Sequence, residues 1–172
     1  IPADQIQVLT PTRKGPCGTI NLNRCLQEAL NPRKPGVREI QWGERLFREG
    51  DRIMQTRNDY DVVWEREDGS VGTGVFNGDV GRITDIDPSG ELVTIAFDDR
   101  TAMYTTEMLS QIDLAYAQTI HKAQGSEYRA VVLCVMPSAP SLMVRGVLYT
   151  AITRARELLV MVGDDAAIRS MA

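Results

Sequence analysis

Two apolar runs lie near the end of the chain, Val131-Val132-Leu133-Cys134-Val135 and Leu158-Leu159-Val160-Met161-Val162. The segment between them, about Leu142 to Ala155, is long enough for a helix, and a short helix is expected over Asp165–Met171. Strands that are apolar on both faces are typical of a parallel sheet that is covered on both faces. This part of the chain therefore predicts a β-α-β unit.

The start of the chain predicts a further strand and helix of the same sheet domain. Ile6–Leu9 has the pattern of a short buried strand, and a helix is expected from about Gly18 to Leu30, where Asn31-Pro32 ends it. The apolar residues of this helix are expected to form its buried face: Ile20, Cys25, Leu26, Ala29 and Leu30.

Charge divides the chain into three parts. The 172 residues carry 19 Lys and Arg against 23 Asp and Glu, a net charge of −4, and residues 51–115 alone carry −9 between ends of +3 and +2. The acidic middle contains six glycines between short alternating runs such as Arg82–Asp87, Leu92–Phe97 and Ala102–Thr105, a pattern typical of a small antiparallel barrel or meander. We therefore predict one α/β domain that is built from both ends of the chain and interrupted by an acidic all-β insertion.

The composition excludes several classes of protein. The longest apolar run, Ala130–Met136, is far shorter than the roughly 20 residues that span a membrane, so no membrane contact is expected. The three cysteines and the single histidine, His121, lack the close pairs of a zinc site, so no metal site is expected. The cysteines are interpreted as reduced and mostly buried in a cytoplasmic protein. Because the chain begins at Ile1, it is interpreted as a piece of a longer protein.

The first segment that suggests chemistry is residues 119–128, which read Thr-Ile-His-Lys-Ala-Gln-Gly-Ser-Glu-Tyr. Its hydroxyl, imidazole, ammonium and amide groups are suitable donors to phosphate oxygens. An ordinary turn that leads into a strand has a similar composition. Both interpretations stay open on these residues alone.

The second such segment is residues 148–156, which read Leu-Tyr-Thr-Ala-Ile-Thr-Arg-Ala-Arg. Arg154 and Arg156 are two residues apart and do not share a helical face, so one can point into a cleft while the other pairs at the surface. An arginine at the mouth of an α/β sheet suits a transferring phosphoryl group. The commoner use of arginine near a helix end is to complement the helix dipole.

Together, these two segments closely resemble motifs V and VI of superfamily 1 DNA helicases, specifically the RecD-like branch. Two further segments are similar to that branch: Val8–Pro16, and Gly50–Tyr60 running on to Phe76–Gly81. The resemblance implies a RecA-like second motor domain (2A), related to the P-loop NTPases, over residues 1–49 and 113–172. It also implies an SH3-like insertion (2B) over residues 50–112.

The resemblance also implies roles for single residues. Arg154 corresponds to the catalytic motif VI arginine that reaches the γ-phosphate of ATP, and Glu127 to the motif V acid near the nucleotide sugar or the water shell of its metal. Gly125 and Arg13 are also assigned to the nucleotide. The residues assigned to the backbone of single-stranded DNA are Thr119, His121, Lys122, Gln124 and Asn58.

The function that follows from the resemblance is that of an ATP-dependent DNA helicase travelling 5′ to 3′. ATP and Mg²⁺ are expected to be bound mainly by the first motor domain, an N-terminal part of the same full-length chain. No lysine of these 172 residues follows a glycine, so a Walker A loop is missing and the isolated residues are expected not to hydrolyse ATP. Leu158–Asp165 superficially resembles a Walker B strand and is interpreted as a core strand.

Two other functions are compatible with parts of the sequence. A non-catalytic module that binds nucleic acid or a protein is the main alternative, and the acidic insertion favours a protein partner because it is a poor phosphate binder. A small-molecule phosphotransferase is disfavoured by the missing Gly-Lys phosphate loop. The aromatic residues suit either base stacking or closure of a small β core: Trp42, Tyr60, Trp64 and Phe76.

Overall fold

The structure, a computed structural model, describes residues 1–172, which divide into two compact units. The sheet unit consists of residues 1–26 and 116–172, and the β-rich unit of residues 27–115. The β-rich unit begins earlier than residue 50, the predicted start of the insertion, because Ile40 and Phe47 belong to its apolar core. Helix α1 (Thr19–Leu30) contributes its first residues to the sheet unit and its last four to the β-rich unit.

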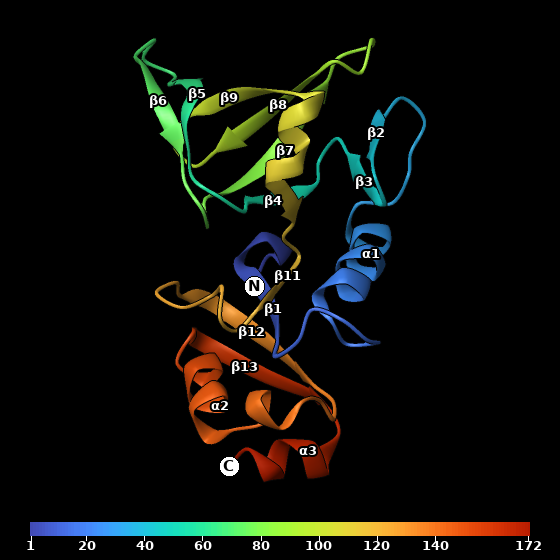
Figure 1. Cartoon of the computed structure of the whole chain (residues 1–172), viewed down its shortest axis with the longest axis vertical. Helices are drawn as coiled ribbons and strands as arrows, with labels where there is room; N and C mark the ends of the chain where they lie inside the picture. Colours follow the sequence, from blue (N-terminus) through green and yellow to red (C-terminus); the bar gives the residue numbers. More distant parts are fainter. The chain divides into compact units, whose positions relative to one another are not determined.

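The sheet unit contains a four-stranded parallel sheet in the order β11-β1-β12-β13 (Figure 1). Its strands are β1 (Ile6–Thr10), β11 (Ala117–Thr119), β12 (Tyr128–Val135) and β13 (Ala155–Gly163). Its remaining helices are η1 (Ala3–Gln5), η3 (Pro140–Leu142), α2 (Arg145–Ile152) and α3 (Asp165–Ser170). The predicted β-α-β unit and the strand at the start of the chain are thus confirmed.

Helices α2 and α3 cover one face of this sheet (Figure 1). Leu9, Val131 and Leu133 of the sheet pack there against Leu148 of α2 and Ala167 of α3. Asp164, one of the acids that follow β13, is the N-cap of α3 and accepts a hydrogen bond from the Ala167 amide at 2.7 Å. This acid therefore stabilises a helix start.

The other face of the sheet differs from the prediction at β13. Leu158, Val160 and Val162 are 48, 41 and 49% exposed, so the expectation of a strand buried on both faces is wrong for this edge strand. Ala155 and Leu159 of β13 pack against the apolar core that includes α2 and α3, whereas Leu158, Val160 and Val162 lie on the other face of the strand.

The β-rich unit is antiparallel and contains a seven-stranded sheet in the order β10-β4-β7-β8-β9-β5-β6 and a separate hairpin of β2 and β3. The strands and the 3₁₀ helix are β2 (Glu39–Trp42), β3 (Arg45–Arg48), β4 (Arg52–Gln55), β5 (Asp59–Glu65), β6 (Val71–Val75), β7 (Val80–Ile86), β8 (Leu92–Phe97), β9 (Thr101–Thr105), η2 (Thr106–Gln111) and β10 (Ile112–Leu114). The expected acidic all-β insertion is therefore present (Figure 1).

The core of the β-rich unit is formed by alternate residues of its strands, such as Ile83, Val93 and Ile95. Trp42 and Trp64 pack against this core, whereas Tyr60 and Phe76 are 66 and 42% exposed. The two tryptophans thus close the β core, and the other two aromatic residues do not.

The buried side of α1 is polar, and the expectation of an apolar buried face is wrong. Ile20 and Leu30 are 61 and 53% exposed, whereas Asn23 and Gln27 are 8 and 3% exposed. In the sheet unit, the Asn23 amide donates to the Ala117 carbonyl at 3.0 Å and its oxygen accepts from the Ala117 amide at 2.8 Å. Asn23 thereby satisfies the free backbone groups of an edge strand.

The cysteines are less buried than expected, since only Cys134 is buried, whereas Cys17 is half-buried and Cys25 is exposed. All three are free thiols. None of the helices combines the length and the apolar character needed to cross a membrane.

Candidate functional site

Arg154 lies at the amino-terminal edge of the parallel sheet, between the end of α2 and the start of β13. Its guanidinium donates to the Ser126 carbonyl at 3.0 Å, to the Thr150 carbonyl at 3.2 Å and to the Thr153 hydroxyl at 3.2 Å. The Arg154 carbonyl accepts from the Tyr128 amide at 2.8 Å, which fixes this residue to the start of β12. All three acceptors of the guanidinium are neutral, and Arg154 forms no ion pair.

Glu127 and Arg156 lie at the same edge. They form a loose surface ion pair at 3.8 Å, with 61 and 67% of their side chains exposed. The two arginines of the second segment thus have different surroundings: Arg156 faces a carboxylate, and Arg154 faces neutral oxygen atoms.

A charged network that the sequence did not indicate adjoins these residues. Arg129 of β12 donates to both carboxylate oxygens of Glu157 of β13, at 2.7 and 2.8 Å, and to Gln5 at 2.7 Å. The Arg129 guanidinium keeps the pKa of Glu157 below its ordinary value. The sequence does not indicate this pair, because the two residues are 28 positions apart and come together only through the pairing of β12 with β13.

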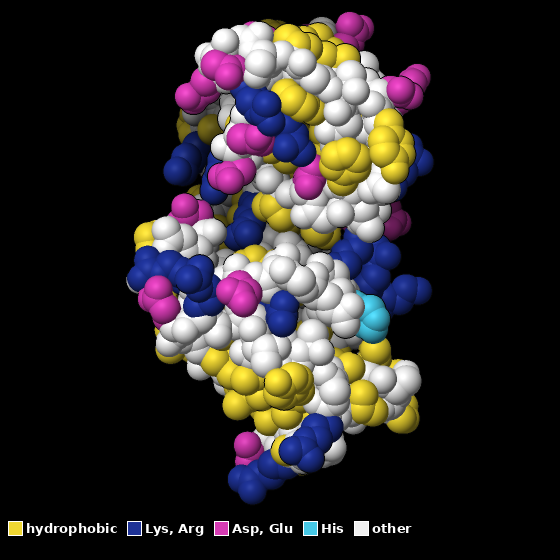
Figure 2. Space-filling model, turned by 90° about the vertical axis from the view of Figure 1, so that its left-hand side faces the viewer, with side chains coloured by type: hydrophobic (Ala, Val, Ile, Leu, Met, Phe, Trp, Pro, Cys, Tyr) yellow, Lys and Arg dark blue, Asp and Glu magenta, His cyan; other side chains and the backbone are white.

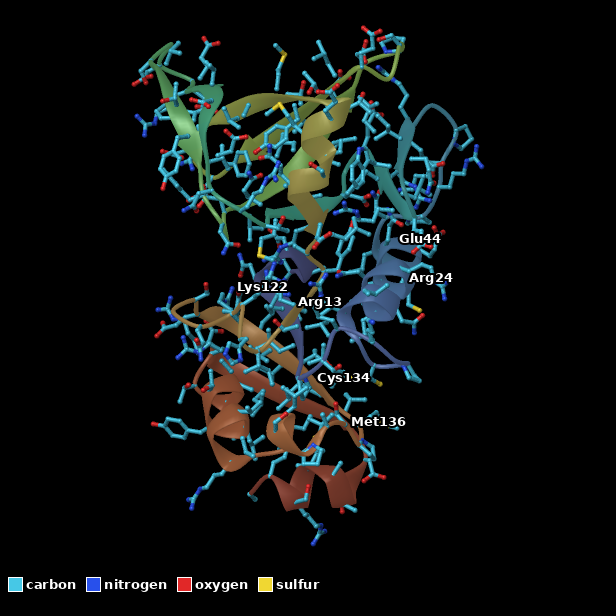
Figure 3. All side chains as sticks on the ribbon, viewed as in Figure 1. Arg13, Arg24, Glu44, Lys122, Cys134 and Met136 are labelled. Atoms are coloured by element: carbon cyan, nitrogen blue, oxygen red, sulfur yellow. The ribbon has the colours of Figure 1, made fainter.

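A second group of predicted residues lies at the carboxyl-terminal edge of the sheet, where β1 and β11 end. Thr10 is opposite Thr119, and the Ile120 amide donates to the Thr10 carbonyl at 3.0 Å. The segments that carry Arg13 and Lys122 therefore leave the sheet at one edge, and both residues are labelled in Figure 3.

The turn after β11 exposes its polar side chains. The Thr119 hydroxyl accepts a hydrogen bond from the backbone amide of Lys122 at 3.3 Å. The Lys122 side chain is exposed and forms no ion pair. His121, the only cyan side chain in Figure 2, also lies at the surface, as does Gln124. Gly125 has a φ of +84°, a conformation that favours glycine.

The two edges are well separated along the sheet. Leu9 is opposite Leu133, so the end of β1 lies beside Cys134, whereas β12 begins at Tyr128. At a rise of about 3.3 Å per residue, these positions of β12 are about 20 Å apart. The resemblance assigns both Arg13 and Arg154 to the nucleotide, but Arg13 lies with Lys122 at the opposite edge of the sheet from Arg154.

Asn58 is the one predicted site residue in the β-rich unit. Its side-chain oxygen accepts from the Asn77 amide at 2.9 Å, and its amide group donates to the Tyr60 hydroxyl at 3.4 Å. Tyr60 meets Phe76 edge to face, with ring centroids 5.7 Å apart. Asn58 thus orders a turn and an exposed aromatic pair.

The loop that carries Arg13 is folded tightly onto the start of α1. The amides of Thr19 and Ile20 donate to the carbonyls of Thr12 and Arg13 at 3.1 and 3.2 Å. Gly18 permits this approach, because a Cβ atom there would lie 2.5 Å from the Arg13 carbonyl carbon and oxygen. Gly18 is a positioning residue that the sequence analysis did not identify.

Gly18→Ala is expected to destabilise the 172-residue chain by about 1–3 kcal/mol, because the added methyl group forces the loop away from α1. Urea unfolding followed by circular dichroism measures this loss. Gly146→Ala is the matched control, since no atom lies within 4 Å of a Cβ at that position in α2. Equal stability of Gly18→Ala and wild type would contradict the close approach.

The two units carry opposite net charge. The sheet unit has nine Lys and Arg against five Asp and Glu, a net +4, and the β-rich unit has a net −8. Among the cations of the sheet unit, Arg13, Lys14 and Lys122 are exposed and form no ion pairs. The carboxyl-terminal edge is therefore suited to an anionic ligand.

Sequence comparison assigns both parts of the chain. Residues 22–97 match the model of the ATP-dependent RecD-like DNA helicase SH3 domain, and residues 114–162 match that of the UvrD-like helicase C-terminal domain. The ATP-dependent RecD2 DNA helicase of Deinococcus radiodurans is 38% identical over 94% of this chain and 20% of its own length. The RecBCD enzyme subunit RecD of Mycobacterium tuberculosis is 29% identical over 97% of this chain and 26% of its own length.

Solved structures support the same fold. Bacteroides Pif1 bound to single-stranded DNA superposes with a TM-score of 0.55 over 91% of this chain and 40% of that chain, at 18% identity. A structure described as two coordinating Pif1 helicases at forked DNA gives a TM-score of 0.56 over 94% of this chain and 39% of that chain, also at 18% identity.

The parallel sheet, the β-rich insertion and the matched domains define a class, the RecA-like helicase motor domain with an SH3-like insertion. Within that class, the chain is a helicase C-terminal region of the RecD-like branch of superfamily 1, and the resemblance predicted from its motifs is confirmed. It spans only 20–26% of the length of the RecD2 and RecD relatives.

Proposed function

We propose that these residues are the second motor domain of an ATP-dependent DNA helicase. In this proposal, residues 1–26 and 116–172 form domain 2A, the β-rich unit forms domain 2B, and the full-length protein works in the cytoplasm. Its first motor domain, in the same chain, supplies the Walker loops that these residues lack. The motor moves 5′ to 3′ along single-stranded DNA.

The observation that carries the proposal is the state of Arg154. The guanidinium is held by three neutral acceptors and by no carboxylate, so its positive charge is not neutralised within the chain. A fixed, uncompensated arginine is what an arginine finger requires, because it must stabilise negative charge on a transferring phosphoryl group. Replacing Arg154 and measuring ATP hydrolysis tests the proposal.

The residues at the amino-terminal edge fit part of a nucleotide site. Arg154 would face the γ-phosphate, and Glu127, beside the exposed backbone of Gly125, would face the sugar or the water shell of Mg²⁺. ATP supplies the phosphoanhydride bond whose hydrolysis releases free energy. These residues bind and orient the nucleotide from one side only, since no phosphate-binding loop is present.

The residues at the carboxyl-terminal edge of the parallel sheet are suited to the phosphate backbone of single-stranded DNA. Lys122 and Arg13 supply charge, and the Thr119 hydroxyl and the His121 and Gln124 side chains supply hydrogen bonds to phosphate oxygens. We place Arg13 with this group on the basis of its location. Asn58 lies in the β-rich unit, so it contributes to binding where the single-stranded DNA extends to that unit.

One segment joins the two groups. Residues 120–127 run from the carboxyl-terminal edge, where Lys122 lies, to the amino-terminal edge, where the Ser126 carbonyl accepts from Arg154 at 3.0 Å. A change in the contacts of Arg154 therefore acts directly on the segment that carries Lys122. We propose that this segment couples ATP hydrolysis to movement along DNA.

We propose that the acidic β-rich unit chiefly contacts a protein and not DNA. With a net charge of −8, it repels phosphate, so a protein contact suits it better than a nucleic acid.

Lys122→Ala is expected to weaken the binding of single-stranded DNA by the full-length protein. The slope of the logarithm of affinity against the logarithm of salt concentration is expected to fall by about one, because one phosphate contact is lost. The loss is expected to be similar for different DNA sequences, because the ammonium contacts phosphate. Fluorescence anisotropy at several salt concentrations measures both quantities.

Lys34→Ala is the matched control, because Lys34 is an exposed lysine of the acidic β-rich unit and also forms no ion pair. It is expected to bind DNA as the wild type does. If Lys122→Ala also keeps the wild-type affinity and salt dependence, Lys122 does not lie on the DNA path.

A further inference from the structure

Cys17 and Cys134 are far apart in sequence and meet in the sheet unit. Leu9 is opposite Leu133, so Thr10 and Cys134 are the next neighbours on the paired strands β1 and β12. The Thr10 hydroxyl donates to the Cys17 carbonyl at 2.6 Å. The loop after β1 thereby brings Cys17 over the end of β12, where Cys134 is labelled in Figure 3.

Leu9 and Leu133 face α2 and α3, so Thr10 and Cys134, the next residues along the two strands, face the opposite side of the sheet. The hydrogen bond from Thr10 places Cys17 on that same side, beside Cys134. Cys134 is 9% exposed, whereas Cys17 is half-buried at the surface of the unit. Burial, together with the neighbouring Cys17 thiol, raises the pKa of Cys134 to about 11, so Cys134 remains protonated at neutral pH. Cys17 is therefore the sulfur that a dissolved oxidant meets first, and Cys134 is the one behind it.

We propose that Cys17 and Cys134 form a reversible oxidation site, at which a hydroperoxide converts the two thiols into a disulfide. Nothing in the proposed motor activity uses either thiol. The third cysteine, Cys25, is a free thiol exposed on α1, so it provides an internal comparison.

The reaction proceeds in two balanced steps. Hydrogen peroxide takes two electrons from the Cys17 sulfur and transfers one oxygen, which gives Cys17 sulfenic acid and one water. The Cys134 sulfur then attacks the Cys17 sulfur, so that the S–S bond forms and the S–O bond breaks. The leaving hydroxide combines with the Cys134 proton as a second water, and a dithiol reverses the process.

The disulfide joins the two separate pieces of the sheet unit. Cys17 belongs to residues 1–26 and Cys134 to residues 116–172, and the polypeptide connects these pieces only through the whole β-rich unit. A cross-link between them closes a long loop and restricts the unfolded chain strongly. It also ties the loop that carries Arg13 to β12. Oxidation therefore locks the sheet unit in its folded arrangement.

The test is peroxide treatment of the folded 172-residue chain at low protein concentration, followed by alkylation of free thiols and mass spectrometry of peptides. Cys25→Ser, Cys17→Ser and Cys134→Ala are treated in parallel, with their folding checked by circular dichroism. We expect a Cys17–Cys134 peptide 2 Da lighter than the sum of the reduced peptides, in wild type and in Cys25→Ser. We also expect that dithiothreitol removes it and that the oxidised chain has the higher melting temperature.

Several results would overturn the proposal. One is the absence of a Cys17–Cys134 peptide while Cys17 is oxidised further to sulfinic acid. Another is a linkage of Cys25 to either residue, or a linkage between chains. A linked chain that melts at the same temperature as the reduced chain would show that the cross-link does not restrain the unit. None of these readouts depends on ATP or DNA, so they are independent of the proposed function.

Discussion

Arg154→Ala is expected to lower the rate of ATP hydrolysis by the full-length protein at least about 10³-fold, the usual effect of losing an arginine finger. The physical reason is that the guanidinium carries an uncompensated charge held by three neutral acceptors, so its loss removes positive charge where phosphoryl transfer develops negative charge. Steady-state phosphate release in the presence of saturating single-stranded DNA measures this effect. Nucleotide binding is expected to change much less than turnover.

Arg156→Ala is the matched control for this prediction. Arg156 is two residues away, is 67% exposed and already faces Glu127 at 3.8 Å. Its removal is expected to leave turnover near the wild-type rate. If Arg154→Ala hydrolyses ATP as fast as Arg156→Ala, Arg154 is not the arginine finger and the non-catalytic binding module becomes the better account.

Arg48→Ala is expected to destabilise the 172-residue chain by about 3 kcal/mol, because it removes a buried guanidinium and leaves the largely buried Glu39 carboxylate without its main partner. Arg48 is 2% exposed and donates to Glu39 at 2.6 Å, to Glu28 at 3.0 Å and to the Asn31 carbonyl. These contacts hold the end of α1 and the β2–β3 hairpin within the β-rich unit. Urea unfolding followed by tryptophan fluorescence reports on the unit that contains Trp42 and Trp64.

Arg33→Ala is the control for Arg48→Ala, because Arg33 contacts the same carboxylate. It lies 3.8 Å from Glu39 with 78% of its side chain exposed, so its loss is expected to change stability little. A similar small effect of Arg48→Ala would show that the buried network does not hold the unit together.

Local pattern predicted much of the fold. The apolar runs at 131–135 and 158–162 became β12 and β13, and the alternating runs between glycines became β7, β8 and β9. These elements follow from the period of their side chains and from turn residues, both of which are properties of a short window of sequence.

Features that depend on distant partners were not predicted. The buried face of α1 is polar because Asn23 pairs with the backbone of Ala117, and Gln27 donates to Asp51 at 2.6 Å. These partners are 94 and 24 positions away in the sequence, so the residues near α1 do not indicate them. For the same reason, the sequence indicated neither the position of Arg13 at the opposite edge from Arg154 nor the neighbouring thiols of Cys17 and Cys134.

In the proposed mechanism, residues 120–127 couple a nucleotide site at one edge of the parallel sheet to a single-stranded DNA site at the opposite edge. The most direct test is the rate of ATP hydrolysis by the full-length protein, with and without single-stranded DNA, in wild type and in Lys122→Ala. We expect DNA to accelerate ATP hydrolysis by the wild type, and Lys122→Ala to need more DNA to reach the same rate. A rate that does not respond to DNA, or a DNA response that Lys122→Ala leaves unchanged, would contradict it.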